Sequence, residues 1–587
     1  MKNILDILSA KLSNAFVEAG YDEKFGKVTI SNRPDLCEYQ CNGAMAGAKA
    51  YKCAPIAIAT AVVDILKEDE TFSEIVAVNP GFINIKVSDE FVSSYIKKMS
   101  EDEHLGVEIS NDRMVVIDYG GANVAKPLHV GHLRSAIIGE TLKRLFRFKG
   151  DKVIGDVHLG DWGLQMGLII EQLRDEQPEL VYFDDNYDGE YPTEPPFTIS
   201  ELEKIYPTAS GKSKVDEVFK ERAQTATLEL QKGKKSYRAL WNHILNVSVA
   251  DLKKNYSNLN VDFDLWKGES DAEEYIGPMV ENMINSGLAH ESQGAMVVDV
   301  MEETDQKEIP PCIIRKSDGA SLYATSDLAT IVQRVADYNP DDIIYLADKR
   351  QEMHFTQVFR TSKKAGITDD HTRLRFLGFG TMNGSDGKPF KTRDGGVMRL
   401  ETLISDINQA VYDKMKENRE VEEEEALATS KIVGLSALKY GDLSNQAAKD
   451  YVFDLDRFTS FEGNTGPYIL YTIVRIKSIL RKYEESGKSL SNLELNKTLT
   501  PTEKSLMMEL GKFNAMIDSA YDELAPHKIC AYIYDLANAF NSFYHENKIM
   551  AEENVTKQAG FIALLLVTKK ALETSIDILG IDAPDRM

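Results

Sequence analysis

Apolar and polar positions follow different patterns in three successive parts of the chain. Between about residues 113 and 400, short apolar runs alternate with segments whose apolar residues recur at helical spacing. Strands that alternate with helices predict a parallel, doubly wound, Rossmann-like sheet that holds ligands at the carboxyl ends of its strands. The apolar runs are MVVIDYG (114–120), VIGDVHLG (153–160), DIIYLAD (342–348) and RLRFLGFGTM (373–382).

The first 108 residues carry a mixed pattern that predicts an α+β domain. The opening residues, MKNILDILSAKLSNAF, have the spacing of an amphipathic helix. We expect a long Ala-rich helix over 44–67, a short strand within 79–88, and a linker over 96–112.

After about residue 400 strand signals almost vanish, and helical periodicity predicts an all-α bundle. An irregular stretch over 177–212, rich in Pro, Asp, Tyr and Gly, predicts an insertion in the middle region. The fold class is therefore multidomain α/β, with domains expected at 1–108, at 109–455 with an insertion near 177–300, and at 456–587. Helices are expected over 401–418, 426–440, 464–486, 502–523, 527–547 and 556–579.

Composition narrows the class of protein. A chain of 587 residues is too long for a single core. No apolar run approaches membrane-spanning length, and five scattered cysteines without a CxxC pattern predict a reducing cytoplasm and no structural zinc. The net charge of −25 argues against a nucleic-acid partner, unless the acidic excess lies on a solvated face, as in EVEEEE (420–425).

The segment KPLHVGHLRSAIIGE (126–140) places two histidines where a helix is predicted to begin. His129 and His132 fall in its first turn, where free N–H groups and the helix dipole attract an anion. Imidazoles there can donate hydrogen bonds to phosphate oxygens. Gly131 leaves room for a flat base against the backbone.

Two other interpretations of the histidine pair stay open. Histidines three apart can bind a metal, but a metal needs a further ligand, and His158 is the only histidine nearby in the sequence. Alternatively, both are capping or core residues, because four matching residues also occur by chance.

Longer segments around and beyond this motif resemble the arginyl-tRNA synthetase family, within the class I aminoacyl-tRNA synthetases. HVGH corresponds to the HIGH-type motif of that class, and the first 108 residues resemble the family's N-terminal domain through EYQCNGAM and PGFINI. The matching segments keep their order and span most of the chain. They include DYGGANVAKPLHVGHLRSAIIGE (118–140), HLGDWGLQMG (158–167), LYATSDLA (322–329), IIYLADKRQEMHFTQVF (343–359) and FGTMNGSDGKPFKTRDGG (379–396).

The resemblance implies an ATP-dependent ligation of L-arginine to tRNA(Arg) through an arginyl-adenylate, with release of AMP and pyrophosphate. It implies a Rossmann-like catalytic domain, an N-terminal tRNA-contacting domain, an all-α anticodon-binding domain and a monomer. It also implies that adenylate formation requires tRNA. Magnesium is expected from the chemistry of ATP, bound with the nucleotide, because the sequence shows no dedicated set of protein ligands for it.

For the phosphate chemistry, the resemblance assigns catalytic roles to His129, His132 and Lys126. The second phosphate element, the KMSKS-type loop, reads KPFKTR (388–393), where Thr392 stands in place of the usual second lysine. Lys388, Lys391 and Arg393 still make this loop basic, although a charged surface loop is the open alternative. The remaining ATP-binding candidates are Gly131, Gly160, Asp161 and Gly163.

Arginine recognition requires a carboxylate with further acceptors, because a guanidinium is a planar set of donors. By resemblance the arginine pocket consists of Asp118, Asn123, Tyr323, Asp327 and Gln351. Asp327 also suits the N-terminal turn of a helix, and that simpler role stays open.

Candidates for tRNA contacts lie in both flanking domains. A basic helical stretch holds Arg475, Lys477, Arg481 and Lys482, and Tyr451, Tyr468, Tyr471 and Tyr544 are either stacking surfaces or core residues. Arg33 and the residues near Tyr39 and Asn42 are the N-terminal candidates. The alternatives are another class I synthetase, an HxGH adenylate-forming ligase, or an RNA-binding relative without catalysis.

Overall fold

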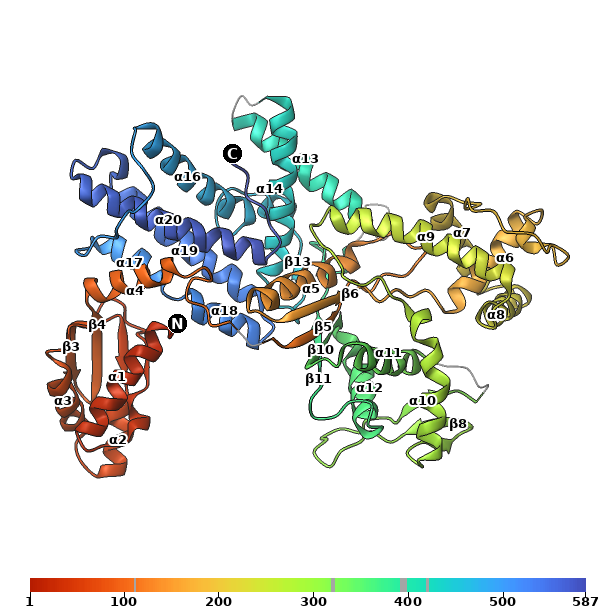
Figure 1. Cartoon of the computed structure of the whole chain (residues 1–587), viewed down its shortest axis with the longest axis horizontal. Coiled ribbons are helices and arrows are strands. Elements are labelled where there is room, and N and C mark those ends of the chain that lie inside the picture. The colour runs from red at the N-terminus through yellow and green to blue at the C-terminus, as the bar shows by residue number, and fades with distance from the viewer. Residues whose placement is uncertain (110–111, 318–321, 391–397, 419–421) are drawn as a thin grey trace. The chain divides into compact units, whose positions relative to one another are not determined.

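The computed structural model describes residues 1–109, 112–317, 322–390, 398–418 and 422–587 (Figure 1). The chain divides into two compact units. The first unit contains Met1–Ile109, Phe461–Asp577 and Asp582–Met587. The second contains Ser110–Ser460 and Ile578–Ile581. Among the described residues, no helix combines the length and the apolar composition that a membrane crossing needs.

The second unit is built on a fully parallel sheet of four strands in the order β11-β10-β5-β6. The central strands are buried on both faces, which explains their continuous apolar sequences. The predicted parallel sheet is therefore confirmed. Its strands are β5 (Met114–Asp118), β6 (Lys152–Asp156), β10 (Asp342–Asp348) and β11 (Arg373–Phe379).

The strand order reverses direction between β5 and β10. From β5 the chain passes through helix α5 (Val130–Phe148) to β6 on one side, whereas β10 pairs with the other side of β5. Such a switch point leaves a crevice at the carboxyl ends of the two strands, where doubly wound sheets bind ligands. Asp118 ends β5 at this place, with Tyr345 and Asp156 as its neighbours in register.

One face of the sheet is covered by α11 (Tyr323–Tyr338) and α12 (Glu352–Lys364), which lie beside β10 and β11 in Figure 1. Val116 and Ile343 pack there against Leu328, Ile331 and Val358. Side chains alternate along a strand, so Val115 and Ile117 point to the opposite face, toward the α5 side.

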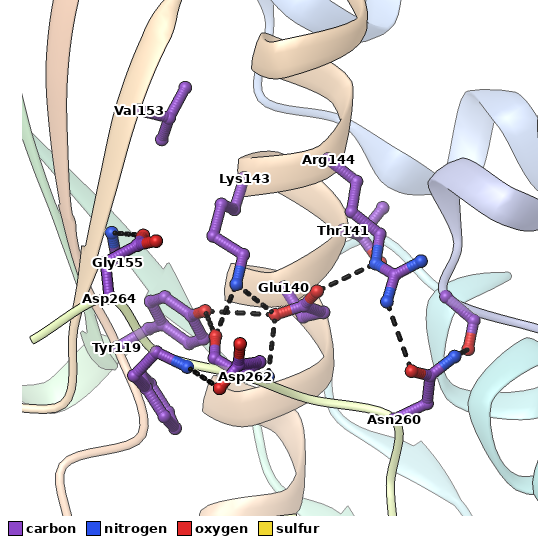
Figure 2. A network of polar contacts seen from close by, with 12 residues as sticks. Tyr119, Glu140, Thr141, Lys143, Arg144, Val153, Gly155, Asn260, Asp262 and Asp264 are labelled. Carbon is purple, nitrogen blue, oxygen red and sulfur yellow. Dashed lines mark hydrogen bonds and ion pairs between the residues drawn. The ribbon is translucent and has the colours of Figure 1, made fainter. Parts of the chain in front are cut away.

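A buried polar network anchors the middle of α5 (Figure 2). The Glu140 carboxylate accepts a hydrogen bond from the Tyr119 hydroxyl at 3.1 Å and pairs with Lys143 at 2.9 Å and Arg144 at 2.7 Å. Although burial opposes it, these two cations lower the pKa of Glu140, which stays ionised. Arg144 also donates to Asn260, whose amide donates to the Gly580 carbonyl. The helix that begins at the histidines is thereby held at its middle.

The stretch 177–212, expected to be irregular, contains helix α7 (Ile199–Lys212). Thr198 and Glu201 form a capping box, and Leu202, Ile205 and Ala209 are buried at helical spacing despite Pro207 inside the helix. The proline and the polar composition hid this periodicity. The other elements of the region are α6 (Leu164–Glu176), η2 (Val181–Phe183), α8 (Glu217–Gln231), α9 (Lys235–Ser257), η3 (Glu269–Ala272), α10 (Glu273–Asn285), β7 (His290–Ser292), β8 (Ala295–Val298) and β9 (Cys312–Arg315).

The rest of the second unit is helical except for one short parallel pair. Helix α14 (Glu423–Leu443) carries Lys439, whose ammonium is buried and donates to the carbonyls of Leu259 and Gly580. This contact fixes residues 578–581 in the second unit. The elements are η4 (Lys349–Gln351), β12 (Met382–Asn383), α13 (Leu400–Asn418), α14 (Glu423–Leu443), β13 (Tyr451–Val452) and α15 (Leu455–Phe458).

The N-terminal part of the first unit is α+β, as predicted, around an antiparallel sheet in the order β1-β2-β4-β3. The helix expected over 44–67 is wrong as one element, because Lys52 adopts a left-handed conformation and Pro55 starts a new helix. The linker expected over 96–112 is helical as far as Glu101. The elements are α1 (Ile4–Glu18), η1 (Glu23–Gly26), β1 (Val28–Ile30), β2 (Tyr39–Cys41), α2 (Gly43–Tyr51), α3 (Pro55–Leu66), β3 (Phe72–Val78), β4 (Phe82–Val87) and α4 (Asp89–Glu101).

The C-terminal part of the first unit is all helical, as predicted. The helix expected over 502–523 is divided at Gly511 into α17 and α18. Lys504 of α17 donates to the Val87 carbonyl at 2.7 Å, so the terminal parts of the chain pack together. The helices are α16 (Gly466–Glu485), α17 (Pro501–Leu510), α18 (Phe513–Asp522), α19 (Pro526–Glu546), η5 (Ile549–Ala551) and α20 (Val555–Ile578).

Candidate active site

The two histidines cap the N-terminus of α5. His129 is the N-cap residue, and its Nδ1 accepts the backbone N–H of Gly131 at 3.0 Å. His132 turns back, so that its Nδ1 accepts the backbone N–H of His129 at 3.2 Å. The two rings lie 4.0 Å apart between centroids. The capping role left open by the sequence is therefore real, and it uses only one nitrogen of each ring.

Both imidazoles are neutral. Burial, together with the nearby His129 and Lys126, lowers the pKa of His132 to about 3. Burial also lowers the pKa of His129, assisted by Lys126. Because Nδ1 accepts a backbone hydrogen in each ring, the proton of the neutral ring lies on Nε2. The N-terminus of α5 therefore carries two Nε2–H donors, one on each ring. Within the described ranges, no group of three or more His, Cys, Asp or Glu residues could hold a metal ion.

Gly131 is needed for the histidine cap itself. A Cβ atom at this position would lie 2.7 Å from Cε1 of His129, closer than real side chains allow. The His129 ring therefore lies against the backbone of Gly131. Contact between Gly131 and the base of ATP stays a prediction.

The turn before the histidines is held from the inserted region. Ala125 adopts a left-handed conformation with φ of 60°, and its N–H donates to the Ser248 hydroxyl of α9 at 2.9 Å. Lys126 follows, with its ammonium 4.6 Å from the ring centroid of Tyr206 of α7. The predicted cation thus lies in the same turn as the histidines.

The segment after β6 lies beside Asn123. The backbones of Asn123 and Gly160 form a bridge, and a Cβ atom at Gly160 would lie 2.1 Å from the Asn123 side-chain oxygen. The Asp161 carboxylate is buried and accepts the backbone N–H and the hydroxyl of Ser270 at 3.0 and 2.6 Å. This side chain orients η3, while Gly163 is the N-cap residue of α6.

The carboxyl ends of β5 and β6 hold a buried acidic pair that shares one cation. Arg334 of α11 donates to Asp118 and to Asp156, each at 2.7 Å. Burial raises the pKa of Asp118, and Arg334 opposes the rise. Two carboxyl groups therefore share one guanidinium at the switch point. Neither Asp156 nor Arg334 was predicted, because Arg334 lies 216 residues from Asp118 along the chain.

The other predicted arginine-pocket residues lie at the starts of α11 and α12. The Asp327 carboxylate contacts Nε2 of His354 at 2.5 Å. Tyr323, the first residue of α11, is 77% exposed. Gln351 precedes α12 and its side chain makes no capping hydrogen bond. His354 was not predicted, although it lies in the same segment as Gln351.

Glu269 is a further carboxylate that the sequence did not reveal. It begins η3, and its backbone N–H donates to the Leu159 carbonyl at 3.0 Å, beside the segment that contains Gly160. Burial raises the pKa of Glu269 to about 7, with Asp161 and Asp327 adding to the rise and His158 opposing it. Only its position after Gly268 in WKGES (266–270) could have drawn attention to it.

The KMSKS-type loop is described only at its ends. Lys388 is exposed in a turn closed by a hydrogen bond from the Gly384 N–H to the Lys388 carbonyl at 2.8 Å. Lys391 and Arg393 lie outside the described residues. Beyond the loop, the Val130 N–H donates to the Met398 carbonyl at 3.1 Å, and Arg399 forms a backbone bridge with His129. The chain thus returns from the loop to the histidine motif.

Among the predicted tRNA contacts, Arg475 lies between the rings of Tyr471 and Tyr544, 4.7 and 5.2 Å from their centroids. Lys477 pairs with Glu573 and Asp585. Arg481 is half-buried and Lys482 is exposed. Tyr468 is hydrogen-bonded to Asn538.

Two of the tyrosines named from the sequence have their rings in a core. Tyr451 is buried and donates to Asp442, and Tyr39 is buried in the N-terminal sheet. In the same N-terminal part, Arg33 pairs with Asp35 at the surface, and Asn42 is the N-cap residue of α2.

Known proteins of one family are similar to this chain over almost its whole length. Family models match at residues 95–455 (tRNA synthetases class I (R), catalytic domain), 469–587 (DALR anticodon binding domain) and 2–87 (arginyl tRNA synthetase N-terminal domain). The arginine–tRNA ligases of Agathobacter rectalis and Alkaliphilus oremlandii are 62% and 57% identical, each with full coverage of both chains.

Solved structures show the same similarity. The arginyl-tRNA synthetase of Plasmodium falciparum superposes with a TM-score of 0.82 at 25% identity, and that of Thermus thermophilus with 0.78 at 21%, both over 100% of each chain. The parallel sheet, the histidine cap and these matches lead to one conclusion: the chain belongs to the arginyl-tRNA synthetase family of the class I tRNA synthetases.

Proposed function

We propose that this chain joins L-arginine to tRNA(Arg) at the carboxyl ends of β5 and β10, in two steps. The arginine carboxylate attacks the α-phosphorus of ATP and releases pyrophosphate. The terminal ribose of tRNA(Arg) then takes the arginyl group and releases AMP. The observation that carries the proposal is the pair of neutral imidazoles at the N-terminus of α5, because each has its Nε2–H available for a phosphate oxygen.

The phosphate contacts combine these donors with nearby cations. Negative charge grows around the α-phosphate during the first step, so fixed donors and positive charges lower its barrier. His129, His132 and Lys126 surround one end of the triphosphate, and Lys388, Lys391 and Arg393 approach from the loop. Gly131, Gly160, Asp161 and Gly163 line the nucleotide. ATP brings Mg²⁺ as its own counter-ion, held by the phosphates.

The arginine pocket is acidic, as a substrate with two cationic groups requires. Asp118 and Asp156 present two carboxyl groups to the single guanidinium of Arg334, and their oxygens suit the substrate ammonium group. Asp327 and Glu269 face the guanidinium, whose donors match carboxylate oxygens. Asn123, Tyr323 and Gln351 supply the remaining polar contacts.

The flanking regions bind the tRNA. Residues 456–587 form the anticodon-binding domain and residues 1–108 the second tRNA-contacting domain, after and before the catalytic domain at 109–455 in the sequence. Arg475, Lys477, Arg481 and Lys482 are the phosphate contacts on α16. The enzyme acts as a monomer in the cytoplasm.

The test separates the two roles of His132. In His132→Asn, the Asn side-chain oxygen takes the place of Nδ1 and keeps the cap, whereas the Nε2–H donor is lost. We expect pyrophosphate exchange with arginine and tRNA present to fall about a hundredfold or more, with tRNA affinity unchanged.

His132→Ala is the matched variant. It should lose the same activity and, in addition, about 1 kcal/mol of stability through the missing cap. A His132→Asn enzyme with the wild-type exchange rate would remove His132 from the phosphate site.

A further inference from the structure

Helix α7 reaches from the inserted region to both cations that border the histidine motif. Glu203 and Tyr206 lie three residues apart, so they share one face of the helix. Tyr206 contacts Lys126, which precedes the histidines, and Glu203 contacts Arg399, which follows the KMSKS-type loop. Two basic groups that are far apart in sequence are thus held by one helical turn.

The Tyr206 ring is fixed where the Lys126 ammonium needs it. The ring packs against the buried cluster of Leu168, Ala209, Phe219 and Ala223. Its face lies 4.6 Å from Nζ of Lys126, within the range of a cation–π contact. The contact with the ring face leaves the N–H donors of the ammonium on the other side for phosphate oxygens.

Glu203 acts on the backbone that pairs with the histidine motif. Its Oε2 lies 2.7 Å from Nη2 of Arg399, and the carboxylate is only 10% exposed. The backbone of Arg399 bridges His129, and the neighbouring Leu400 N–H donates to the Leu128 carbonyl at 3.0 Å. A displacement of Arg399 would therefore reach the cap of α5.

We propose that Tyr206 and Glu203 are positioning residues for adenylate formation: before ATP binds, Tyr206 holds Lys126 at the triphosphate site, and Glu203 holds Arg399, whose backbone pairs with His129. A free lysine side chain loses much conformational freedom when its ammonium becomes fixed. The Tyr206 ring restricts it in advance, and such preorganisation favours the transition state. This inference rests on the proposed role of Lys126 in the phosphate site.

The first test compares Tyr206→Leu with Tyr206→Phe in pyrophosphate exchange, with arginine and tRNA present. Leucine keeps the apolar packing but has no ring face, so kcat should fall about three- to thirtyfold. Phenylalanine keeps the face and should stay within about twofold of wild type. The KM for arginine is measured beside kcat, because the Tyr206 hydroxyl interacts with Tyr323 of the arginine pocket and both variants lose it. Melting temperatures of both variants report on packing.

Three outcomes would overturn the inference while the proposed function stands. They are a Tyr206→Leu enzyme with wild-type kcat, equal losses in the Leu and Phe variants, or a loss that follows the melting temperature. Failure of the wild-type enzyme to exchange pyrophosphate with arginine would instead overturn the proposed function.

The second test changes Glu203→Gln, which removes the charge opposite Arg399. We expect about a two- to fivefold lower kcat, as for a partly exposed ion pair. Glu217→Gln is the control, because Glu217 lies on α8 and forms an exposed local ion pair with Lys220. Equal kcat values for the two variants would remove Glu203 from the positioning role.

Discussion

At the scale of single residues, the site depends on two histidines whose ring nitrogens have different roles. Each histidine of the α5 cap uses Nδ1 for the fold and leaves Nε2 for chemistry. Burial keeps His132 neutral at any pH at which the protein works. A loss of activity between pH 5 and 8 would therefore have to come from another group.

We expect that group to be Glu269, because burial raises its pKa to about 7. Its carboxylate is mostly protonated at pH 6 and mostly ionised at pH 8. An arginine guanidinium binds the ionised form, so the KM for arginine should fall as pH rises through about 7. Steady-state charging assays at pH 6, 7 and 8 would measure this.

Glu269→Gln is the control for the pH effect. It should raise the KM for arginine at pH 8 about tenfold, the effect of losing one charged hydrogen bond, and flatten its pH dependence. The KM for ATP should stay constant. An unchanged pH dependence in this variant would assign the titration to a different residue.

At the scale of elements, the two ends of the parallel sheet have separate roles. The carboxyl end holds Asp118, Asp156 and the residues near the histidine cap. The amino end holds Asp342, the first residue of β10, fully buried beneath Arg113, Arg373 and Arg375, which approach its carboxylate within 2.9 Å. This second cluster joins β10 and β11 to the residue before β5, at the end of the sheet opposite the reacting groups.

Asp342→Asn should therefore reduce stability and leave the chemistry intact. The variant leaves three arginines around an uncharged side chain. Removing one partner of a buried ion pair lowers the free energy of unfolding by about 3–5 kcal/mol. Denaturant unfolding of the second unit would show the lower free energy of unfolding. The rate of pyrophosphate exchange per folded molecule should not change. Glu281→Gln, at the exposed pair with Arg315, should cost less than about 1 kcal/mol.

At the scale of the whole molecule, the two ends of the chain contribute to one compact unit. Residues Met1–Ile109 share it with Phe461–Asp577. Lys504 of α17 donates to the Val87 carbonyl and pairs with Glu38 at 2.8 Å, and the Leu499 N–H donates to Asp89. The N-terminal sheet and the C-terminal helices should therefore protect each other against local unfolding.

Lys504→Met tests this coupling. The variant leaves the Val87 carbonyl and Glu38 without their cation, so the first unit should lose about 1–3 kcal/mol. Hydrogen exchange should accelerate in β4 and in α17 together, but not in β5 or β10. Lys497→Met, at an exposed pair with Glu90, is the control and should leave exchange unchanged. Faster exchange in only one of β4 and α17 would contradict the coupling.

The elements with strong local periodicity could be predicted from the sequence. Strand β10 matches its predicted range of 342–348, and the helix opened by the histidines begins at Val130. Predictions failed where one residue overrides the pattern. Lys52 breaks a long apolar helix, and Pro207 disguises α7. Backbone conformation at such positions depends on packing that periodicity does not contain.

For the site, sequence alone determined the residue types at the strand ends and the helix start, because motif spacing and the carboxyl-end rule are local properties of a doubly wound sheet. Only the tertiary structure decided their partners. Arg334 lies between Asp118 and Asp156, Glu269 lies near Asp327, and α7 reaches Lys126. These contacts join residues tens to hundreds of positions apart. Their charge balance, burial and pKa values arise from long-range packing, which no short stretch of sequence encodes.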